Sequence, residues 1–282
     1  MRLLSWNIQS TKGCDHVFNI DRIIKGIQAF GNLDVICLQE VSRHMVPYNN
    51  DDQKSLIEER FAGYHSTWAP GFSRPLANGK KQEFGNLTLV KQEVLLDQRI
   101  HQLPNPCVSP AIQIPRTVAE TVIRYKDTNI TLLNTHLAYH SEIESTQQIV
   151  YLTQLRDQIL SHKNSLTTTL ISSDNDAYHL AQKGQHVILC GDLNIALNST
   201  KYLKMTNDMA WIDSADIVIK DANDSVRQPT CGIFDTALWP GGAHVRDYFL
   251  CSLGLHDKIK NMEVNTSTTA SDHQPICLTL ED

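Results

Sequence analysis

The stretch VILCGDLN, residues 187–194, constrains the fold of this chain more than any other segment. Its first five residues are apolar or small and predict a buried strand. The strand ends in Asp192 and Asn194, whose side chains point to the same face of an extended chain because they are two residues apart. A carboxylate in this position is costly unless a metal, a proton-transfer partner or a substrate uses it. A simple turn is the alternative interpretation, since Gly, Asp and Asn are all turn residues.

Composition places the chain among soluble globular proteins. Of its 282 residues, 41% are hydrophobic and 20% are charged, which allows a large core. The net charge is −6, whereas a nucleic-acid-binding protein usually carries a basic stripe. Any polyanionic substrate would therefore need local cations or metal ions to hold it.

The seven cysteines contain no CxxC pair, and several lie inside apolar runs, namely Cys37, Cys190, Cys251 and Cys277. This distribution fits neither a disulfide framework nor a zinc cluster. The N-terminus lacks the features of a secretion signal, and no apolar window approaches the length of about 18 residues that a transmembrane segment needs. We therefore expect a cytoplasmic protein.

Hydrophobic periodicity predicts alternating strands and helices along the whole chain. The opening unit is a strand over residues 2–8, a helix over 19–30 and a strand over 33–38. Further helices are expected over 51–61, 142–161 and 176–183, and further strands over 64–68, 87–91, 117–125, 130–137, 187–191, 245–252, 259–264 and 275–280. Irregular segments are expected over 70–86, 103–115 and 161–175, where Gly, Pro, Ser and Thr concentrate.

No linker of distinct composition divides the chain, so we expect residues 1–282 to form one domain. Clusters of strands broken by a few long helices favour an α/β (α+β) sandwich, in which helices lie outside stacked sheets.

Five more apolar runs carry a metal-competent or proton-competent side chain at or near their ends. These side chains are Asn7, Glu40, His136, Asp247 and the pair Asp272–His273. Each has a purely structural alternative when taken alone: a turn cap, a solvated strand end, a satisfied core histidine or a local ion pair. Their recurrence favours function, because the ends of strands on one rim of a sandwich can converge.

The ordered motifs SWNI (5–8), LQEV (38–41), GN (85–86), NTHL (134–137), GDLN (191–194), DY (247–248) and SDH (271–273) resemble those of the endonuclease/exonuclease/phosphatase superfamily. This superfamily contains metal-dependent phosphoesterases such as deoxyribonuclease I. The resemblance implies a deoxyribonuclease I-like four-layer α/β sandwich with two stacked mixed or antiparallel sheets, flanked by helices, and an active site at one rim. It also implies a phosphoric ester hydrolase.

Hydrolysis of a phosphate ester needs a positioned water, a base and positive charge near the phosphoryl oxygens. Carboxylates such as Glu40 and Asp272, helped by the Asn7 amide, suit Mg²⁺ or Mn²⁺ better than zinc. We therefore predict a divalent-metal site formed by these three residues.

The resemblance assigns the catalytic roles. His273 and Asp192 would orient and deprotonate water, in a division that the sequence leaves open. Asp247 would hold the His273 imidazole in the right tautomer. His136 and Asn194 would donate hydrogen bonds to the phosphoryl oxygens. Asn86 would orient Asp192 or contact phosphate, and Arg116 resembles an arginine that several branches use near the phosphate.

Two positions depart from branches of the superfamily. Some nuclease branches carry Tyr where this chain has His136, and His is more similar to the deoxyribonuclease I, sphingomyelinase and phosphatase side. Arg246 directly precedes Asp247, whereas the common pattern puts a basic residue two positions before the Asp. Alternation would turn Arg246 to the opposite face from Asp247.

Substrate choice depends on the loops between motifs. Arg74 and the neighbouring lysines could bind backbone phosphates, and Trp239 could stack on a base or a lipid, although a solvated loop and a packing tryptophan are the simpler interpretations. We expect a monomeric phosphodiesterase that acts on nucleic-acid-type substrates, DNA or RNA. The alternatives are a phosphatase or phospholipase C-like hydrolase of a small phosphoester or lipid headgroup, and a binding module without catalysis.

Overall fold

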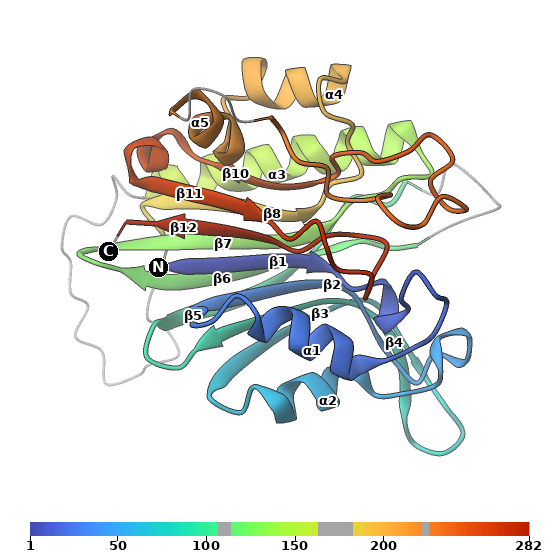
Figure 1. Ribbon diagram of the computed structural model, residues 1–282. Coiled ribbons are helices and arrows are strands. Elements are labelled where there is room, and N and C mark those ends of the chain that lie inside the picture. The colour runs from blue at the N-terminus through green and yellow to red at the C-terminus, as the bar shows by residue number, and fades with distance from the viewer. Residues whose placement is uncertain (107–113, 163–182, 222–225, 282) are drawn as a thin grey trace, which may run out of the picture.

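Two six-stranded sheets stack face to face at the centre of the molecule (Figure 1). The structure is a computed structural model that describes residues 1–106, 114–162, 183–221 and 226–281. The first sheet contains, in spatial order, β11 (Ile259–Val264), β12 (Ile276–Leu280), β1 (Arg2–Asn7), β2 (Val35–Arg43), β4 (Lys81–Lys91) and β3 (Tyr64–Pro75). The second contains β5 (Leu95–Gln102), β6 (Thr117–Tyr125), β7 (Thr128–His136), β8 (His186–Asp192), β10 (Asp247–Cys251) and β9 (Ile212–Asp213).

Both sheets are mixed. The pairs β1–β2 and β7–β8 are parallel, and the other pairs are antiparallel. Each parallel pair is joined by a crossover that contains a helix, as parallel strands require. These two crossovers place α1 and α3 on the outside of the stacked sheets.

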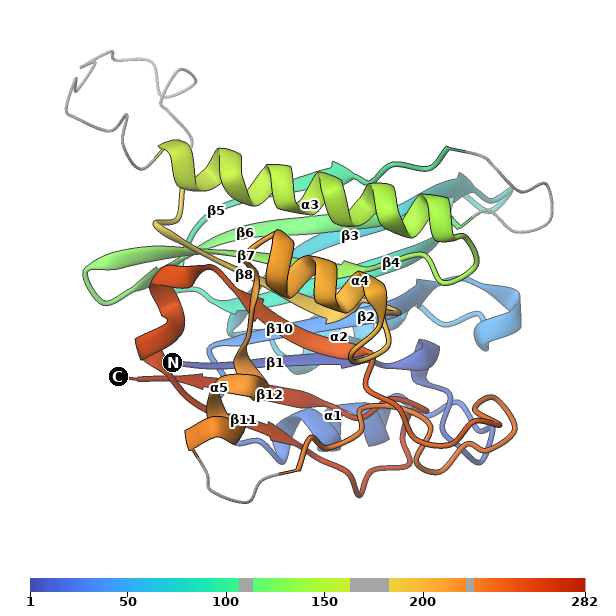
Figure 2. The same cartoon turned by 90° about the horizontal axis from the view of Figure 1, so that it is seen from above.

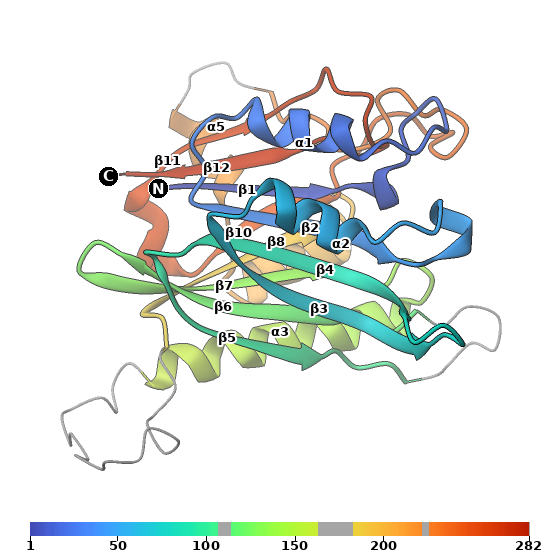
Figure 3. The same cartoon turned by 90° about the horizontal axis from the view of Figure 1, so that it is seen from below.

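Helices cover the outer faces. The first sheet carries α1 (Ile20–Gln28) and α2 (Gln53–Arg60) (Figure 3), and the second carries α3 (Glu142–His162) and α4 (Thr200–Leu203) (Figure 2). The remaining helix, α5 (Ser214–Asp221), lies against β10 and β11. Short helical segments are η1 (Gln9–Thr11), η2 (Val46–Tyr48), η4 (Lys204–Asp208) and η5 (Leu253–Lys258). The expected four-layer sandwich is confirmed.

Three apolar layers hold the sheets and helices together. One lies between the sheets and includes Leu3, Cys190 and Phe249; the other two lie under the helices of each outer face. The six cysteines of the described residues are all free, and five of them are buried. Cys37, Cys190, Cys251 and Cys277 pack as small apolar side chains in the core, as their positions in strand-like runs predicted.

The segment 70–86, expected to be a loop, is mostly a hairpin of β3 and β4. Its prolines and Gly71 suggested a break, but β3 is an edge strand, where a proline removes no hydrogen bond that the sheet needs. A register shift between Pro70 and Phe72 accommodates the extra residue. The hairpin extends beyond the end of the sandwich that also carries the ends of β1 and β7 (Figure 1).

The other expected elements are mostly confirmed, with ends that shift by one or two residues, except that β2 continues five residues past its expected end at residue 38. The strand β5 has no counterpart among the expected elements. Most of the segment 161–175, nearly all of the expected helix 176–183 and part of the irregular segment 103–115 lie outside the described residues. No helix in the described ranges combines the length and the apolar character needed to cross a bilayer.

Candidate active site

Several strands that carry polar residues singled out by the sequence end at one side of the sandwich, opposite the two termini (Figure 1). At this end β1, β7 and β8 finish and β10 begins. The register aligns His136 of β7 and Asp247 of β10 with Asp192 of β8, so that three neighbouring strands present these side chains at one level. The sheet pairing therefore assembles the centre of the site.

The GDLN segment has a backbone that fixes Asp192. Gly191 has a φ of +131°, and a Cβ added there would lie 1.8 Å from the carbonyl oxygen of Thr135, so only glycine fits between the strands. Asn194 has a φ of +53°, in the left-handed region that Asn tolerates. Its backbone N–H donates to Asp192 Oδ1 at 2.9 Å. The turn that the sequence suggested is therefore present, and its backbone holds the Asp192 carboxylate in place.

Asp247 and His273 form a buried pair, with His273 Nδ1 2.9 Å from Asp247 Oδ2. His273 Nε2 lies 3.6 Å from Asp192 Oδ2 on the other side of the ring. Burial would lower the pKa of His273, but the carboxylates around it, led by Asp247 and Asp192, raise the pKa well above its ordinary value. The imidazole is thus held as a cation between two carboxylates.

Asp192 lies between Asn7, His136 and His273. Its Oδ2 accepts a hydrogen bond from Asn7 Nδ2 at 3.0 Å and lies 3.3 Å from His136 Nε2. Burial would raise the pKa of Asp192, but the His273 charge and the donors around it lower the pKa instead. Asp192 therefore stays a carboxylate at neutral pH.

His136 is neutral, because burial and the nearby charge of Arg116 lower its pKa to about 3. The Asn194 amide nitrogen, which also donates to the Leu137 carbonyl, lies 2.9 Å from His136 Nε2. Since the amide nitrogen is a donor, Nε2 accepts and the ring proton lies on Nδ1. That Nδ1 is buried and has no hydrogen-bond partner among the described residues.

Glu40 and Asp272 form an acidic pair beside this group. Glu40 lies within β2, which continues past it, and not at the end of the strand as the sequence suggested. A bulge between Leu38 and Val41 gives Glu40 a φ of +57° and redirects its side chain. Burial, together with the charge of Asp272, raises the pKa of Glu40 to about 7.

The raised pKa of Glu40 bears on the metal prediction, because it means that the described residues do not fully compensate the negative charges of Glu40 and Asp272. A bound cation would supply the missing positive charge. A separate group of possible ligands, Asp192, Asp247 and His273, has atoms within 4.8 Å of one another, but the His273 imidazole already pairs with Asp247. The Glu40–Asp272 pair is therefore the better fit for a divalent ion. Asn7, predicted as a third ligand, donates from Nδ2 to both Glu40 and Asp192, while its Oδ1 accepts from the Gln9 N–H.

Arg116 is buried, not solvated as an arginine after a proline would usually be. Its Nε has no hydrogen-bond partner among the described residues, and burial lowers its pKa. Arg116, Asn86 and His136 line the same narrow pocket. Asn86 donates to the Thr117 carbonyl at 3.0 Å, and it is Asn7 that donates to Asp192, the contact that the sequence suggested for Asn86.

Trp239 contacts the site directly. Its Nε1 donates to Asp272 Oδ2 at 3.1 Å, and its ring meets the His273 ring edge-on at 5.7 Å between centroids. Arg74 lies apart, exposed on the hairpin with its guanidinium over the Phe72 ring. A role for Arg74 in substrate binding stays a prediction.

Three supporting residues were not predicted. Thr230 donates to Asp247 Oδ2 at 2.7 Å and so orients the partner of His273. Gln39 Nε2 donates to Asn134 Oδ1 at 2.8 Å and ties the two sheets together beside the site. Gln39 and Asn134 belong to the LQEV and NTHL motifs, so a polar residue inside each buried strand was the signal available in the sequence. Thr230 gave no such signal.

A known protein family matches most of the chain. The model of the Endonuclease/Exonuclease/phosphatase family matches residues 4–273. No curated protein sequence matches the chain.

Similar solved structures include an endonuclease/exonuclease/phosphatase from Beutenbergia cavernae (17% identity, 99% of this chain and 70% of that chain, TM-score 0.67). Others are a mannosyl-6-phosphatase from Bacteroides thetaiotaomicron (15% identity, 100% of both chains, TM-score 0.69) and truncated TDP2 from Caenorhabditis elegans (18% identity, 100% of this chain and 97% of that chain, TM-score 0.62). These structures share the fold. Because the family model covers nearly the whole chain, the protein belongs to the endonuclease/exonuclease/phosphatase family.

Proposed function

We propose that the protein is a divalent-metal-dependent phosphodiesterase that acts on nucleic-acid-type substrates. Members of the family are phosphoesterases and generally use a divalent metal. The observation that carries the proposal is a pair of buried donors without partners, Arg116 Nε and His136 Nδ1, in one pocket beside the carboxylates of the site. A phosphoryl group brings the acceptor oxygens that these donors lack.

Glu40 and Asp272 would hold the metal, with Mg²⁺ or Mn²⁺ favoured by their hard oxygen ligands. When bound, the ion would supply Lewis-acid polarisation of the phosphoryl group. Trp239 would keep the Asp272 carboxylate in position through its 3.1 Å hydrogen bond.

The water that attacks phosphorus would be oriented by Asp192, and its proton would pass into the Asp192–His273 pair. Asp247 and Thr230 would hold the His273 ring in place. Arg116 and His136 would bind the developing charge on the phosphoryl oxygens, with Asn194 fixing the His136 tautomer.

Aromatic side chains near the site support a substrate with bases. Trp239 is partly exposed beside His273, and Tyr139, three residues after His136, is 61% exposed. Exposed rings of this kind can stack on nucleobases.

Hydrolysis of bis-p-nitrophenyl phosphate with Mg²⁺ or Mn²⁺ tests the reaction. We expect EDTA to abolish turnover and His273→Ala and Asp192→Ala to lower kcat by about 100-fold or more. His256→Ala, in the exposed η5 segment at the opposite end, is the matched control and should keep full activity. Turnover that resists EDTA, or full activity in both site variants, would contradict the mechanism.

A substrate panel tests the class. Duplex DNA, single-stranded DNA and RNA would be compared with p-nitrophenyl phosphate, sphingomyelin and phosphoinositides. Faster turnover of a monoester or a lipid would favour the phosphatase or phospholipase C-like alternative. A folded protein that turns over none of them would be a binding module.

We further propose that residues 1–282 act as one domain and as a monomer in the cytoplasm. Free thiols at the six described cysteines fit that reducing compartment.

A further inference from the structure

A second pocket lies near the active site and is lined by two arginine side chains. It has a volume of about 350 Å³ and is lined by Arg227, His244 and Arg246, together with the smaller Ala196, Leu197 and Pro229. None of the described lining residues carries a carboxylate. The two arginines make the pocket locally positive, in a chain whose net charge is −6. The pocket therefore has the chemistry of an anion site.

The two arginines of the pocket differ. Arg227 forms an ion pair with the buried Asp213 at 2.9 Å, so its charge is largely balanced. In the part of the chain that the structure describes, the Arg246 guanidinium has neither an ion pair nor a hydrogen bond, and its Nη1 is buried without a partner. A buried guanidinium N–H without an acceptor costs free energy that a bound oxyanion would recover.

Short contacts connect this pocket to the catalytic residues. The Thr230 hydroxyl accepts from the backbone N–H groups of Arg246 and Asp247, at 2.9 and 3.0 Å, and donates to the Asp247 carboxylate. On the other wall, the His244 ring contacts the Trp239 ring at 5.9 Å, and Trp239 contacts His273 at 5.7 Å between centroids. Two rings thus separate the pocket from the catalytic imidazole.

We propose that this pocket binds a second phosphate of the substrate, namely a phosphate of the same nucleic-acid strand that is not the one hydrolysed. The inference rests on the proposed phosphodiesterase function and extends it to a strand longer than one phosphodiester. A small ester with one phosphate would leave the pocket empty, because Arg246 lies next to Asp247 on the β10 side of Asp192, whereas His136 lies on the β7 side. Only an extended polyanion would reach both.

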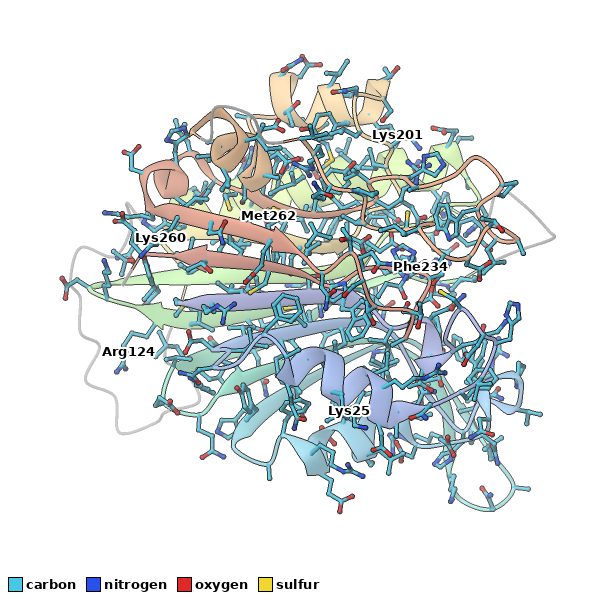
Figure 4. All side chains as sticks on the ribbon, viewed as in Figure 1. Lys25, Arg124, Lys201, Phe234, Lys260 and Met262 are labelled. Atoms are coloured by element: carbon cyan, nitrogen blue, oxygen red, sulfur yellow. The ribbon has the colours of Figure 1, made fainter. Side chains whose placement is uncertain are left out.

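Binding is tested with a short fluorescein-labelled single-stranded oligonucleotide and Mg²⁺, in the His273→Ala background so that the strand is not cleaved. We expect Arg246→Gln to raise Kd by about tenfold and to lower the slope of log Kd against log salt by about 0.7, the value for one phosphate contact on a single strand. Arg124→Gln is the matched control. Arg124 is exposed at the opposite end of the molecule, whereas the labelled Phe234 lies at the end with the site (Figure 4).

Kinetics separate this proposal from the proposed function. In the otherwise unchanged enzyme, Arg246→Gln should raise KM for the oligonucleotide by about tenfold and leave kcat/KM for bis-p-nitrophenyl phosphate unchanged, since that diester has one phosphate. Equal loss on both substrates, or no change in Kd and KM, would overturn the second phosphate site while phosphodiesterase activity stands. If the enzyme hydrolyses neither substrate, the proposed function fails, and the oligonucleotide Kd alone decides whether the pocket binds phosphate.

Discussion

At the scale of single residues, both the β7–β8 pairing and the position of Asp192 depend on the absence of a side chain at Gly191. Its φ of +131° leaves no room for a side chain, because an added Cβ would lie 1.8 Å from the Thr135 carbonyl oxygen. We expect Gly191→Ala to lower the free energy of unfolding by about 3 kcal/mol or more, because β7 and β8 must separate to admit the methyl group. Urea denaturation measures this change.

Gly63→Ala is the control for this substitution. A Cβ at Gly63 meets no heavy atom within 4 Å, and its φ is not positive, so stability should change by less than about 0.5 kcal/mol. Equal stability of the Gly191→Ala variant and the wild type would show that the β7–β8 contact yields without cost.

Residue type and position were enough to predict which polar residues lie together at one end of the sandwich, but not the environment of each one. His136, Asp192 and Asp247 were identifiable because apolar runs lead into them, and the strand register aligns them. The burial of Arg116 could not be predicted, because it depends on the packing of segments distant in sequence. The Trp239 contact with Asp272 has the same origin, since 33 residues separate the two.

At the scale of elements, strands were predictable where both faces are buried and difficult to predict at sheet edges. The central strands β1, β2, β7 and β8 are almost entirely buried, and each contains a short apolar run. The edge strands β3 and β5 are partly exposed, and β3 contains prolines, so their sequences resemble loops. The bulge at Glu40 was also hidden, because it is defined by the register against β4.

A buried ion-pair cluster fixes the edge strand β5 to β6. The Glu120 side chain is fully buried and contacts His101 and Arg99 at 2.6 Å and Lys183 at 3.0 Å. Burial alone would raise the pKa of Glu120, but these partners lower it to about 2. Because the pKa in the folded state lies below the ordinary value of 4.5, the cluster stabilises the fold above about pH 4.5 and loses this contribution as the pH falls toward 2.

We therefore expect Glu120→Gln to be less stable than the wild type by about 2 kcal/mol at pH 6, allowing for the partial exposure of its partners. The difference should shrink progressively below pH 4.5. Urea denaturation of both proteins between pH 6 and 3.5 tests this, with the exposed Glu93→Gln as a control that should show no such trend. A difference that stays constant with pH would mean that packing, not charge, dominates.

At the scale of the whole molecule, the site exists because two sheets are held in one relative position. Glu40 and Asp272 project from the first sheet and its connections, whereas Asp192 and Asp247 belong to the second. The Gln39–Asn134 hydrogen bond and the apolar layer between the sheets fix that position. The order of motifs predicted the fold, but only the stacked sheets show which carboxylates come together.

Metal binding should consequently stabilise the entire fold. A free concentration of Mg²⁺ or Mn²⁺ about ten times its dissociation constant should raise the free energy of unfolding by about 1.4 kcal/mol. This corresponds to a rise in Tm of about 4 °C. In Glu40→Gln this rise should disappear, while the metal-free variant should be at least as stable as the metal-free wild type, because the amide removes the repulsion between Glu40 and Asp272. Glu59→Gln, exposed on α2, should keep the full rise. Thermal denaturation with and without metal measures both effects. If the metal raised the Tm of Glu40→Gln as much as that of the wild type, Glu40 would not be a metal ligand.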